Sequence, residues 1–240
     1  MSFKPLLTAF CIVLLLFSCN EDSNTTFSII TVTTDNNKLV EINIPKAEGN
    51  NEISKNINNE INKVVSASLH IGEETPNAEA SIEENIEKFN TEYNDFAKDF
   101  PESTFPWEAQ IDGEVIFQSP ELISISITSY TNTGGAHGNV VISFLNLDAL
   151  TGKRIANEEL FNNEKDFETI AKTYFDKSIE DKNTLFEPEN FQLAQNIGFS
   201  EEGLIMLYNT YEIAPYSAGI IEYTIPAEEV NSLLAINSPH

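Results

Sequence analysis

The chain has 240 residues, in which 38 Asp and Glu face 13 Lys and Arg, so that its formal net charge is −25 at pH 7. Hydrophobic residues make up 41% of the sequence, which is enough apolar material for a folded core and excludes a wholly disordered chain. Because nucleic-acid binding needs clustered Lys and Arg, the acidic balance excludes nucleic acid as a partner. The negative charge is typical of a protein kept soluble by repulsion between its molecules, or of one that attracts a basic partner.

The first 18 residues have the pattern of a secretory signal peptide. Lys4 precedes an apolar run over residues 9–17, which is about half the length of a helix that spans a bilayer. The run ends in Leu16-Phe17-Ser18-Cys19, which resembles the lipobox of bacterial lipoproteins, in which the cysteine is lipidated. We therefore expect cleavage before Cys19, lipidation of Cys19 and a polar tether over residues 19–26. An ordinary signal peptide that happens to be followed by a cysteine is the alternative.

Cleavage at this position would remove Lys4 and Cys11, leaving a slightly more acidic chain whose only cysteine is Cys19. The folded part is then expected to have no disulfide, no thiolate nucleophile and no cysteine-bound metal. We expect the protein at the cell envelope, lipid-anchored at the outer membrane, the cell surface or the periplasmic face. Glu21 and Asp22, close behind the cysteine, resemble the surface-export signals of some lipoproteins.

The first part of the chain predicts strands followed by two helices. The β-rich segments are residues 28–34 and 39–44, and Pro45 is expected to end the second strand because it cannot donate a ladder hydrogen bond. Apolar residues then recur at helical spacing over residues 51–69 and 82–100. Pro101 and Pro106 mark the end of the second helix.

The remainder predicts strands at residues 107–117, 122–130 and 140–147, the last two joined by a turn at Gly134-Gly135. A helix over residues 160–179, a hairpin of residues 191–199 with 204–208, a strand over residues 220–225 and a short helix from Pro226 to residue 234 follow. We therefore predict an α+β fold with two small packed subdomains, residues 27–104 and 105–237, each with an antiparallel sheet.

The sequence holds three histidines. His70 ends a helical stripe and is expected to be a partly exposed cap, and His240 is the last residue. His137 lies in the glycine-rich segment Thr133-Gly134-Gly135-Ala136-His137-Gly138. It is either a catalytic base or recognition residue on an exposed loop, or an imidazole that bonds backbone carbonyls and locks a hairpin.

No established catalytic or metal-binding motif occurs. The patterns HExxH, CxxC, HxH, GxSxG, GxGxxG and GxxxxGK[ST] are all missing, so we predict no catalytic residue, no metal and no cofactor. Carboxylates are abundant, which leaves a glycosidase pair open. Residues 148–153 lack the alternating ligands of a calcium loop and are expected to form a β-turn.

Two ordered groups of motifs resemble a known family. The first group is Tyr130, Gly134-Gly135-Ala136-His137-Gly138, Asn146-Leu147-Asp148, Thr151-Gly152-Lys153 and Leu160-Phe161. The second group is Phe199, Gly203, Tyr211-Glu212-Ile213-Ala214-Pro215-Tyr216-Ser217-Ala218-Gly219 and Ile225-Pro226. Together they resemble the RsiV-like C-terminal domain, a bacterial extracytoplasmic family of formally unknown function. The Ile44-Pro45 strand end and the two helices resemble its usual N-terminal partner, also found before PdaC-type peptidoglycan deacetylases, so that the resemblance covers residues 27–235.

The resemblance implies a binding role. RsiV is an anti-sigma factor that senses lysozyme through this extracellular region, and the deacetylases carry their catalysis in a separate downstream domain, which is not expected in this chain. We therefore expect a lipid-anchored, non-enzymatic envelope module that recognises a lysozyme-like muramidase or another envelope protein. A peptidoglycan-binding or glycan-binding accessory module is the alternative, and a hydrolase that uses carboxylates or His137 is the weakest hypothesis.

The candidate binding residues come from the two most specific motifs, and they are Gly134, Gly135, His137, Tyr211, Pro215 and Tyr216. Tyrosines exposed on a loop that proline and glycine stiffen make good recognition anchors. The alternative is that Tyr211, Pro215 and Tyr216 complete the core beneath the last strand.

Overall fold

The computed structural model describes residues 25–49, 51–72, 77, 80–102 and 105–236. The strands are β1 Phe27–Thr31, β2 Val40–Ala47, β3 Glu108–Gln118, β4 Leu122–Asn132, β5 Asn139–Asp148, β6 Asn196–Ser200, β7 Gly203–Tyr208 and β8 Ile221–Pro226. The α-helices are α1 Glu52–Ser68, α2 Ile82–Asp99, α3 Glu164–Ser178 and α4 Ala227–Val230, and short 3₁₀ turns are η1 Asn157–Glu159, η2 Lys182–Thr184, η3 Tyr216–Ala218 and η4 Asn231–Leu233.

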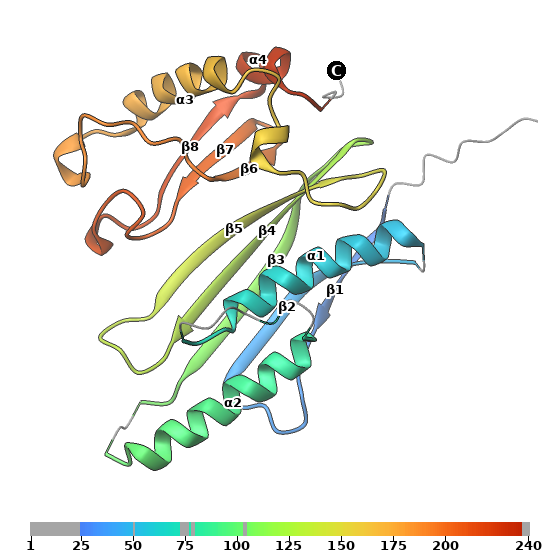
Figure 1. The fold of residues 1–240 in the computed structure, drawn as a ribbon, viewed down its shortest axis with the longest axis vertical. Coiled ribbons are helices and arrows are strands. Elements are labelled where there is room, and N and C mark those ends of the chain that lie inside the picture. The colour runs from blue at the N-terminus through green and yellow to red at the C-terminus, as the bar shows by residue number, and fades with distance from the viewer. Residues whose placement is uncertain (1–24, 50, 73–76, 78–79, 103–104, 237–240) are drawn as a thin grey trace, which may run out of the picture.

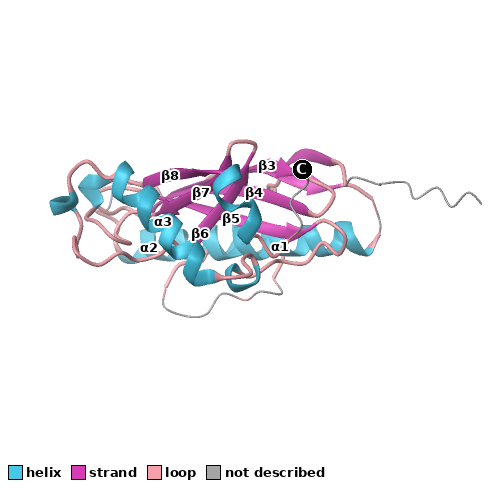
Figure 2. Ribbon diagram, turned by 90° about the horizontal axis from the view of Figure 1, so that it is seen from above, coloured by secondary structure: helices cyan, strands magenta, loops and turns pink. Residues whose placement is uncertain are grey.

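These elements form an α+β fold with two sheets, which confirms the predicted fold class. The first sheet has the order β1-β2-β3-β4-β5 and the second the order β6-β7-β8 (Figure 1). Helices α1 and α2 lie together on one face of the five-stranded sheet (Figure 2), and α3 and α4 pack with the second sheet in a separate core. Among the described residues, no helix combines the length and apolarity that crossing a bilayer requires.

We call the five-stranded sheet with α1 and α2 the first layer, and the three-stranded sheet with α3 and α4 the second layer. Helices α1 and α2 form where their apolar stripes predicted them. The Asn51 side chain caps α1 by accepting from the Ser54 amide (2.7 Å), and Ile57, Ile61 and Val65 are buried on the face toward the sheet. Ser81 begins α2 with a capping box, in which its hydroxyl and the Glu84 side chain satisfy each other's backbone amides.

The strand that contains Pro45 continues past the proline, contrary to the prediction. β2 extends to Ala47, and Pro45 lies opposite Ile29 of β1. The amide of Val32 bonds to the Ile42 carbonyl, so the even-numbered residues of β2 bond to β1 and the Pro45 nitrogen faces the other side. There the pairing with β3 has already ended at Asn43, and a Cβ on Gly113 would lie 2.7 Å from the proline ring. The proline is tolerated because its nitrogen, which cannot donate a hydrogen bond, faces an edge of β2 where pairing with β3 has already ended.

The five-stranded sheet contains strands from both sides of the expected boundary at residues 104 and 105. β2 and β3 are hydrogen-bonded neighbours and run parallel, with Val40 paired to Ala109. A parallel pair needs a long crossover, and α1 and α2 provide it. The expected boundary therefore lies within the first layer and not between the two sheets, which are separated in sequence by the segment after β5.

In the second layer, two elements begin later in the chain than predicted. α3 begins at Glu164 and not at residue 160, because Asn163 caps it and the preceding Leu160 and Phe161 pair with the C-terminal segment near Leu234. β6 begins only at Asn196, since the chain before it follows an irregular path in which the Gln192 carbonyl accepts the Tyr208 hydroxyl (2.6 Å).

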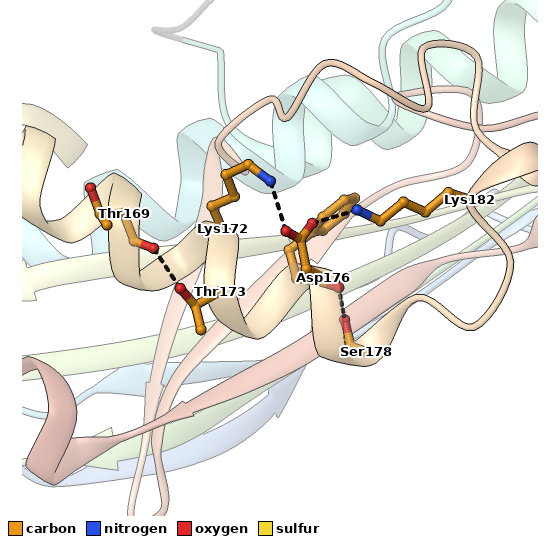
Figure 3. Close-up of polar contacts among 7 residues, drawn as sticks. Thr169, Lys172, Thr173, Asp176, Ser178 and Lys182 are labelled. Atoms are coloured by element: carbon orange, nitrogen blue, oxygen red, sulfur yellow. Dashed lines mark hydrogen bonds and ion pairs between the residues drawn. The ribbon is translucent and has the colours of Figure 1, made fainter.

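The exposed side of α3 carries one compact ion-pair cluster. Lys172 and Lys182 donate to the two oxygens of Asp176 at 2.7 and 2.8 Å (Figure 3). These hydrogen bonds hold the pKa of the Asp176 carboxyl below its ordinary value. The cluster fastens the end of α3 to η2.

The second layer covers the free edge of β5 with asparagine side chains. Asn196 accepts from the Phe144 amide and donates to the Ile142 carbonyl, at 2.8 and 2.7 Å. Asn209 makes the same two kinds of bond with Ile142, at 2.9 and 3.0 Å. Side-chain amides thus replace the neighbouring strand that an exposed sheet edge would otherwise recruit.

Candidate recognition surface

The loop between β4 and β5 carries the first candidate motif. The Asn132 side chain accepts from the Gly134 amide (3.0 Å), and Gly134 has a φ of +84°, a conformation in which glycine is favoured. The tip residues Gly134, Gly135 and His137 are exposed. The Gly134-Gly135 turn lies where it was predicted, at the end of the β4–β5 hairpin.

The segment between β7 and β8 carries the second motif. Asn209 and Glu212 close its first turn, because the Asn209 amide donates to the Glu212 carboxylate (2.9 Å). Ala214 is only 3% exposed and anchors the segment, and the Ile213 carbonyl accepts from the Phe186 amide (2.9 Å). Pro215 then precedes the η3 turn.

The structure brings the two motifs together, although about 75 residues separate them in the sequence. The Tyr216 ring stacks on the His137 imidazole, with ring centroids 3.8 Å apart and an angle of 19° between the planes. The Tyr216 hydroxyl donates to the Gly138 carbonyl (3.2 Å), which also lies 3.1 Å from His137 Nδ1. The Tyr211 ring follows at 5.8 Å from that of Tyr216. We call His137, Tyr211 and Tyr216 the aromatic patch.

The tyrosines of the patch lie on the surface and not in the core. Tyr211 is 56% exposed and Tyr216 is 37% exposed, and Pro215 is also exposed. The sequence left two hypotheses open for this segment, exposed recognition anchors or residues that complete the core, and the exposure of these side chains agrees with the first. His137 is exposed, as expected of a recognition residue on a loop, and its ring also contacts the Gly138 carbonyl, as expected of an imidazole that locks the hairpin.

Gly138 is the residue that allows the hairpin to close against its own strand. A Cβ at this position would lie within 2.5 Å of two ring carbons and the hydroxyl oxygen of Tyr130. The missing side chain lets the Tyr130 ring pack directly on the backbone whose carbonyl receives Tyr216.

A hollow beside the patch, lined by both aromatic and polar side chains, was not predicted. Its volume is about 310 Å³, and Phe186, Phe191, Ile213 and Glu212 are among its lining residues. Phe186 is 56% exposed at the rim. Sequence reasoning missed Phe186 because it belongs to no motif, and only its bond to Ile213 places it beside the second loop.

Two buried tyrosines lie behind this surface and have a structural role. Burial raises the pKa of Tyr223 to about 12, and it raises the pKa of Tyr208 further. Both phenols are therefore neutral at physiological pH, and their rings pack with Phe175 in the second core.

The other sequence candidates lie apart from the patch. His70 follows the α1 cap residue Leu69 and is half-buried, and Asp148 closes its predicted β-turn by accepting from the amides of Leu150 and Thr151. Cys19 and His240 lie outside the described residues. Within the described ranges, no group of three or more His, Cys, Asp and Glu side chains is arranged to hold a metal ion.

Comparison with known proteins matches one family to the part of the chain before most of β5 and another to the part after β5. Residues 32–140 match the family described as Deacetylase PdaC, and residues 149–228 match the family described as Protein of unknown function (DUF3298). No curated protein sequence matches the chain at a significant level.

Two solved structures share the fold. A DUF3298 family member from Bacteroides fragilis is 16% identical with a TM-score of 0.63, covering 88% of this chain and 94% of its own. A DUF3298 family protein from Pseudomonas aeruginosa is 20% identical with a TM-score of 0.59, covering 89% of this chain and 95% of its own. The family matches and the shared fold agree, and the chain therefore carries a segment that matches the PdaC family followed by a segment that matches the DUF3298 family, the architecture that its motifs predicted.

Proposed function

We propose that this chain is a non-enzymatic binding module of the cell envelope that recognises a basic protein of the lysozyme type through the aromatic patch. The PdaC and DUF3298 segments indicate an uncharacterised, envelope-associated domain family. The single observation that carries the finer proposal is the stack of Tyr216 on His137, which joins two exposed loops into one surface.

The geometry of the patch favours recognition of a protein. Tyrosine supplies a large contact area at a low cost in side-chain entropy, and here stacking and the bond to Gly138 already restrict the Tyr216 side chain. The hollow next to it combines aromatic side chains with the carboxylates of Glu212 and Glu187, a lining suited to a long basic side chain of a partner. The net charge of −25 would accelerate encounter with a basic partner.

Calorimetry with a basic c-type lysozyme tests the proposal. The mature chain is expected to bind with a Kd of about 1 µM or below, and Tyr216→Ala is expected to weaken binding about tenfold or more. Ile29→Ala is the matched control, because Ile29 is a 63% exposed apolar residue on β1 at the opposite sheet edge. Unmeasurable binding to lysozyme, or equal binding to cytochrome c as an unrelated basic protein, would contradict the proposal.

The same samples test the non-enzymatic part. We expect no muramidase, deacetylase or other hydrolytic activity on peptidoglycan. An activity that His137→Ala abolishes would overturn this part, and the aromatic patch would then be a catalytic site.

We also propose that a lipid on Cys19 holds the module at the envelope. Metabolic labelling with a clickable fatty acid is expected to mark the wild-type chain and not Cys19→Ser. Labelling that survives the substitution would exclude this anchor without bearing on the aromatic patch.

A further inference from the structure

A basic surface lies along α1 of this acidic protein. Most described lysines outside it have a partner on the protein: Lys88, Lys98, Lys172 and Lys182 pair with carboxylates and Lys177 lies over the Tyr174 ring. In contrast, no ion pair within the described residues involves Lys46, Lys55, Lys153 or Arg154. Lys38 and Lys165 are the unpaired cations elsewhere in the described part of the chain.

These unpaired cations line two adjoining hollows on the solvent side of α1. One has a volume of about 600 Å³ and contains Lys153 and Arg154, together with Lys63, which pairs with Glu60. The other has a volume of about 520 Å³ and contains Lys46 and Lys55. Asn59 belongs to both and is exposed between them. We call this surface the α1 groove, formed by Lys46, Lys55, Asn59, Lys63, Lys153 and Arg154.

The walls of the groove are held in place by specific contacts. Gly152 has a φ of +69°, and a Cβ there would lie 2.4 Å from the Ile53 carbonyl oxygen, so the turn before Lys153 packs directly on α1. Asn56 fixes the same turn by donating to the Thr151 carbonyl (2.8 Å). On the other side, Asn58 bonds both the amide and the carbonyl of Ala47, at 2.8 and 3.0 Å. The cations therefore project from a preformed frame.

Two carboxylates, Glu60 and Glu48, also line the hollows. Glu60 pairs with Lys63, and Glu48 accepts the Ser28 hydroxyl. Asp148 is occupied with the backbone amides of its own turn. A ligand that enters the groove thus meets four cations without an ion pair, Lys46, Lys55, Lys153 and Arg154, against one carboxylate of that kind, Glu48, and it also meets the amide of Asn59.

We propose that the α1 groove binds a short acidic glycan segment that carries carboxylates next to hydroxyl and acetamido groups. Lysine and arginine match carboxylates through charge-assisted hydrogen bonds. The Asn59 amide both donates and accepts, as hydroxyl and acetamido groups do. A phosphate polymer fits less well, because it offers the Asn59 carbonyl no donor and its dense charge meets the chain's overall repulsion. This site lies on α1 and is independent of the proposed function of the aromatic patch.

Calorimetric titration of the mature chain with disaccharide-tetrapeptide muropeptides tests the site. Binding is expected with a Kd of about 100 µM or below and is expected to weaken with added salt. The double variant Lys153→Gln/Arg154→Gln is expected to bind about tenfold more weakly or worse. Lys38→Gln/Lys165→Gln is the matched control that removes two unpaired cations elsewhere and is expected to bind as the wild type does.

Two further arms separate the outcomes. Chitotetraose has the acetamido groups without the carboxylates and is expected to bind more weakly than the muropeptide. Lys55→Gln/Asn59→Ala gives a second weakening variant at exposed positions, in case the first does not fold. The proposal is overturned if the muropeptide does not bind, if the groove variants bind it normally, or if short polyphosphate binds as tightly as the muropeptide. Tyr216→Ala is expected to leave muropeptide binding unchanged, so this site and the aromatic patch can fail separately.

Discussion

Tyr211 has a backbone φ of 69°, a region that residues with a Cβ rarely adopt, and its side chain is 56% exposed. A strained residue whose ring makes little use of the core is typical of a site where conformation serves binding. Its neighbour Tyr216 is ordered by contacts with His137 and Gly138. At the residue scale, the aromatic patch therefore combines one strained and one stacked tyrosine.

The substitution Tyr211→Gly is expected to stabilise the fold while it weakens lysozyme binding. Glycine relieves the left-handed conformation, and we expect a gain of about 0.5–1 kcal/mol in the free energy of unfolding. Chemical denaturation measures this gain, and Tyr216→Gly, at a position without positive φ, is expected to destabilise instead. A loss of stability in Tyr211→Gly comparable to that of the control would mean that packing holds Tyr211.

The buried phenols predict a loss of stability at alkaline pH. The pKa of Tyr223 in the folded chain is about 12 and that of Tyr208 is also raised, whereas an unfolded tyrosine titrates near about 10. The folded chain then binds more protons than the unfolded chain above about pH 10, so the free energy of unfolding falls as the pH rises toward 12. Denaturation at a series of pH values is expected to show this fall, and Tyr223→Phe is expected to reduce its slope. An unchanged slope in the variant would show that Tyr223 titrates normally.

Sequence reasoning identified the residues of the patch but not their contact. Glycine spacing and the Tyr-Pro content of the second motif are local signals, so Gly134, Gly135, His137, Tyr211, Pro215 and Tyr216 could be chosen from the sequence. The stack of His137 on Tyr216 depends on how the second sheet covers β5, and no local pattern encodes this arrangement. Phe186 was missed for the same reason.

At the scale of elements, a buried polar network joins the two sheets. Asn146 of β5 accepts the Ser124 hydroxyl (2.8 Å) and donates to the Ile197 carbonyl of β6 (2.7 Å). The Ser124 oxygen also accepts from the Phe199 amide (3.2 Å). Because these groups are buried, each needs its partner, and the network fixes where β6 lies on β4 and β5.

Asn146→Ala is expected to destabilise the chain by about 2–3 kcal/mol, since it leaves the Ile197 carbonyl and the Ser124 hydroxyl without a partner. Thermal unfolding measures the change. Asn59→Ala, an exposed asparagine on α1, is the control and is expected to shift stability by less than about 0.5 kcal/mol. Equal effects of the two substitutions would show that the network does not join the layers.

Gly152→Ala is expected to be far more damaging than Gly72→Ala, although both glycines have positive φ, at 69° and 101°. Strain costs about 1 kcal/mol in either variant, but only at position 152 would the new Cβ meet a backbone oxygen, at 2.4 Å, whereas nothing lies within 4 Å at Gly72. Thermal unfolding of the two variants isolates the steric part. Equal losses of stability would mean that the turn does not pack tightly on α1.

Helices and hairpins were predictable because their signals are periodic and local. The stripes of α1 and α2 and the alternation of β4 gave these elements nearly to the residue. The prediction that Pro45 ends its strand was wrong because the effect of a proline depends on the neighbouring strand. Here β3 no longer pairs with β2 at Pro45, so the proline breaks no hydrogen bond. The position of the boundary was missed because the parallel pair of β2 and β3 joins segments more than 60 residues apart, which no local pattern reveals.

At the scale of the whole molecule, the charge of the chain is unevenly distributed. The acidic excess favours encounter with a basic protein, whereas the unpaired cations on α1 form a separate site for an acidic ligand. The two surfaces lie in different parts of the fold, one between the β4–β5 hairpin and the loop after β7, the other on α1.

Association with lysozyme is therefore expected to be strongly salt-dependent in rate and weakly so in residence time. Raising the ionic strength from about 20 to about 300 mM is expected to lower the association rate constant about tenfold or more, because screening removes long-range steering. Stopped-flow fluorescence measures the rate. An association rate that is independent of salt would show that the acidic charge serves solubility alone.

The most direct test of the recognition surface is hydrogen exchange of the mature chain with and without saturating basic c-type lysozyme. The proposal predicts that backbone amides of residues 133–139 and 209–219 become protected together, with no protection along β1 or on the solvent side of α1. Protection confined to only one of the two loops, protection elsewhere, or no change at all would contradict a binding surface built from His137, Tyr211 and Tyr216.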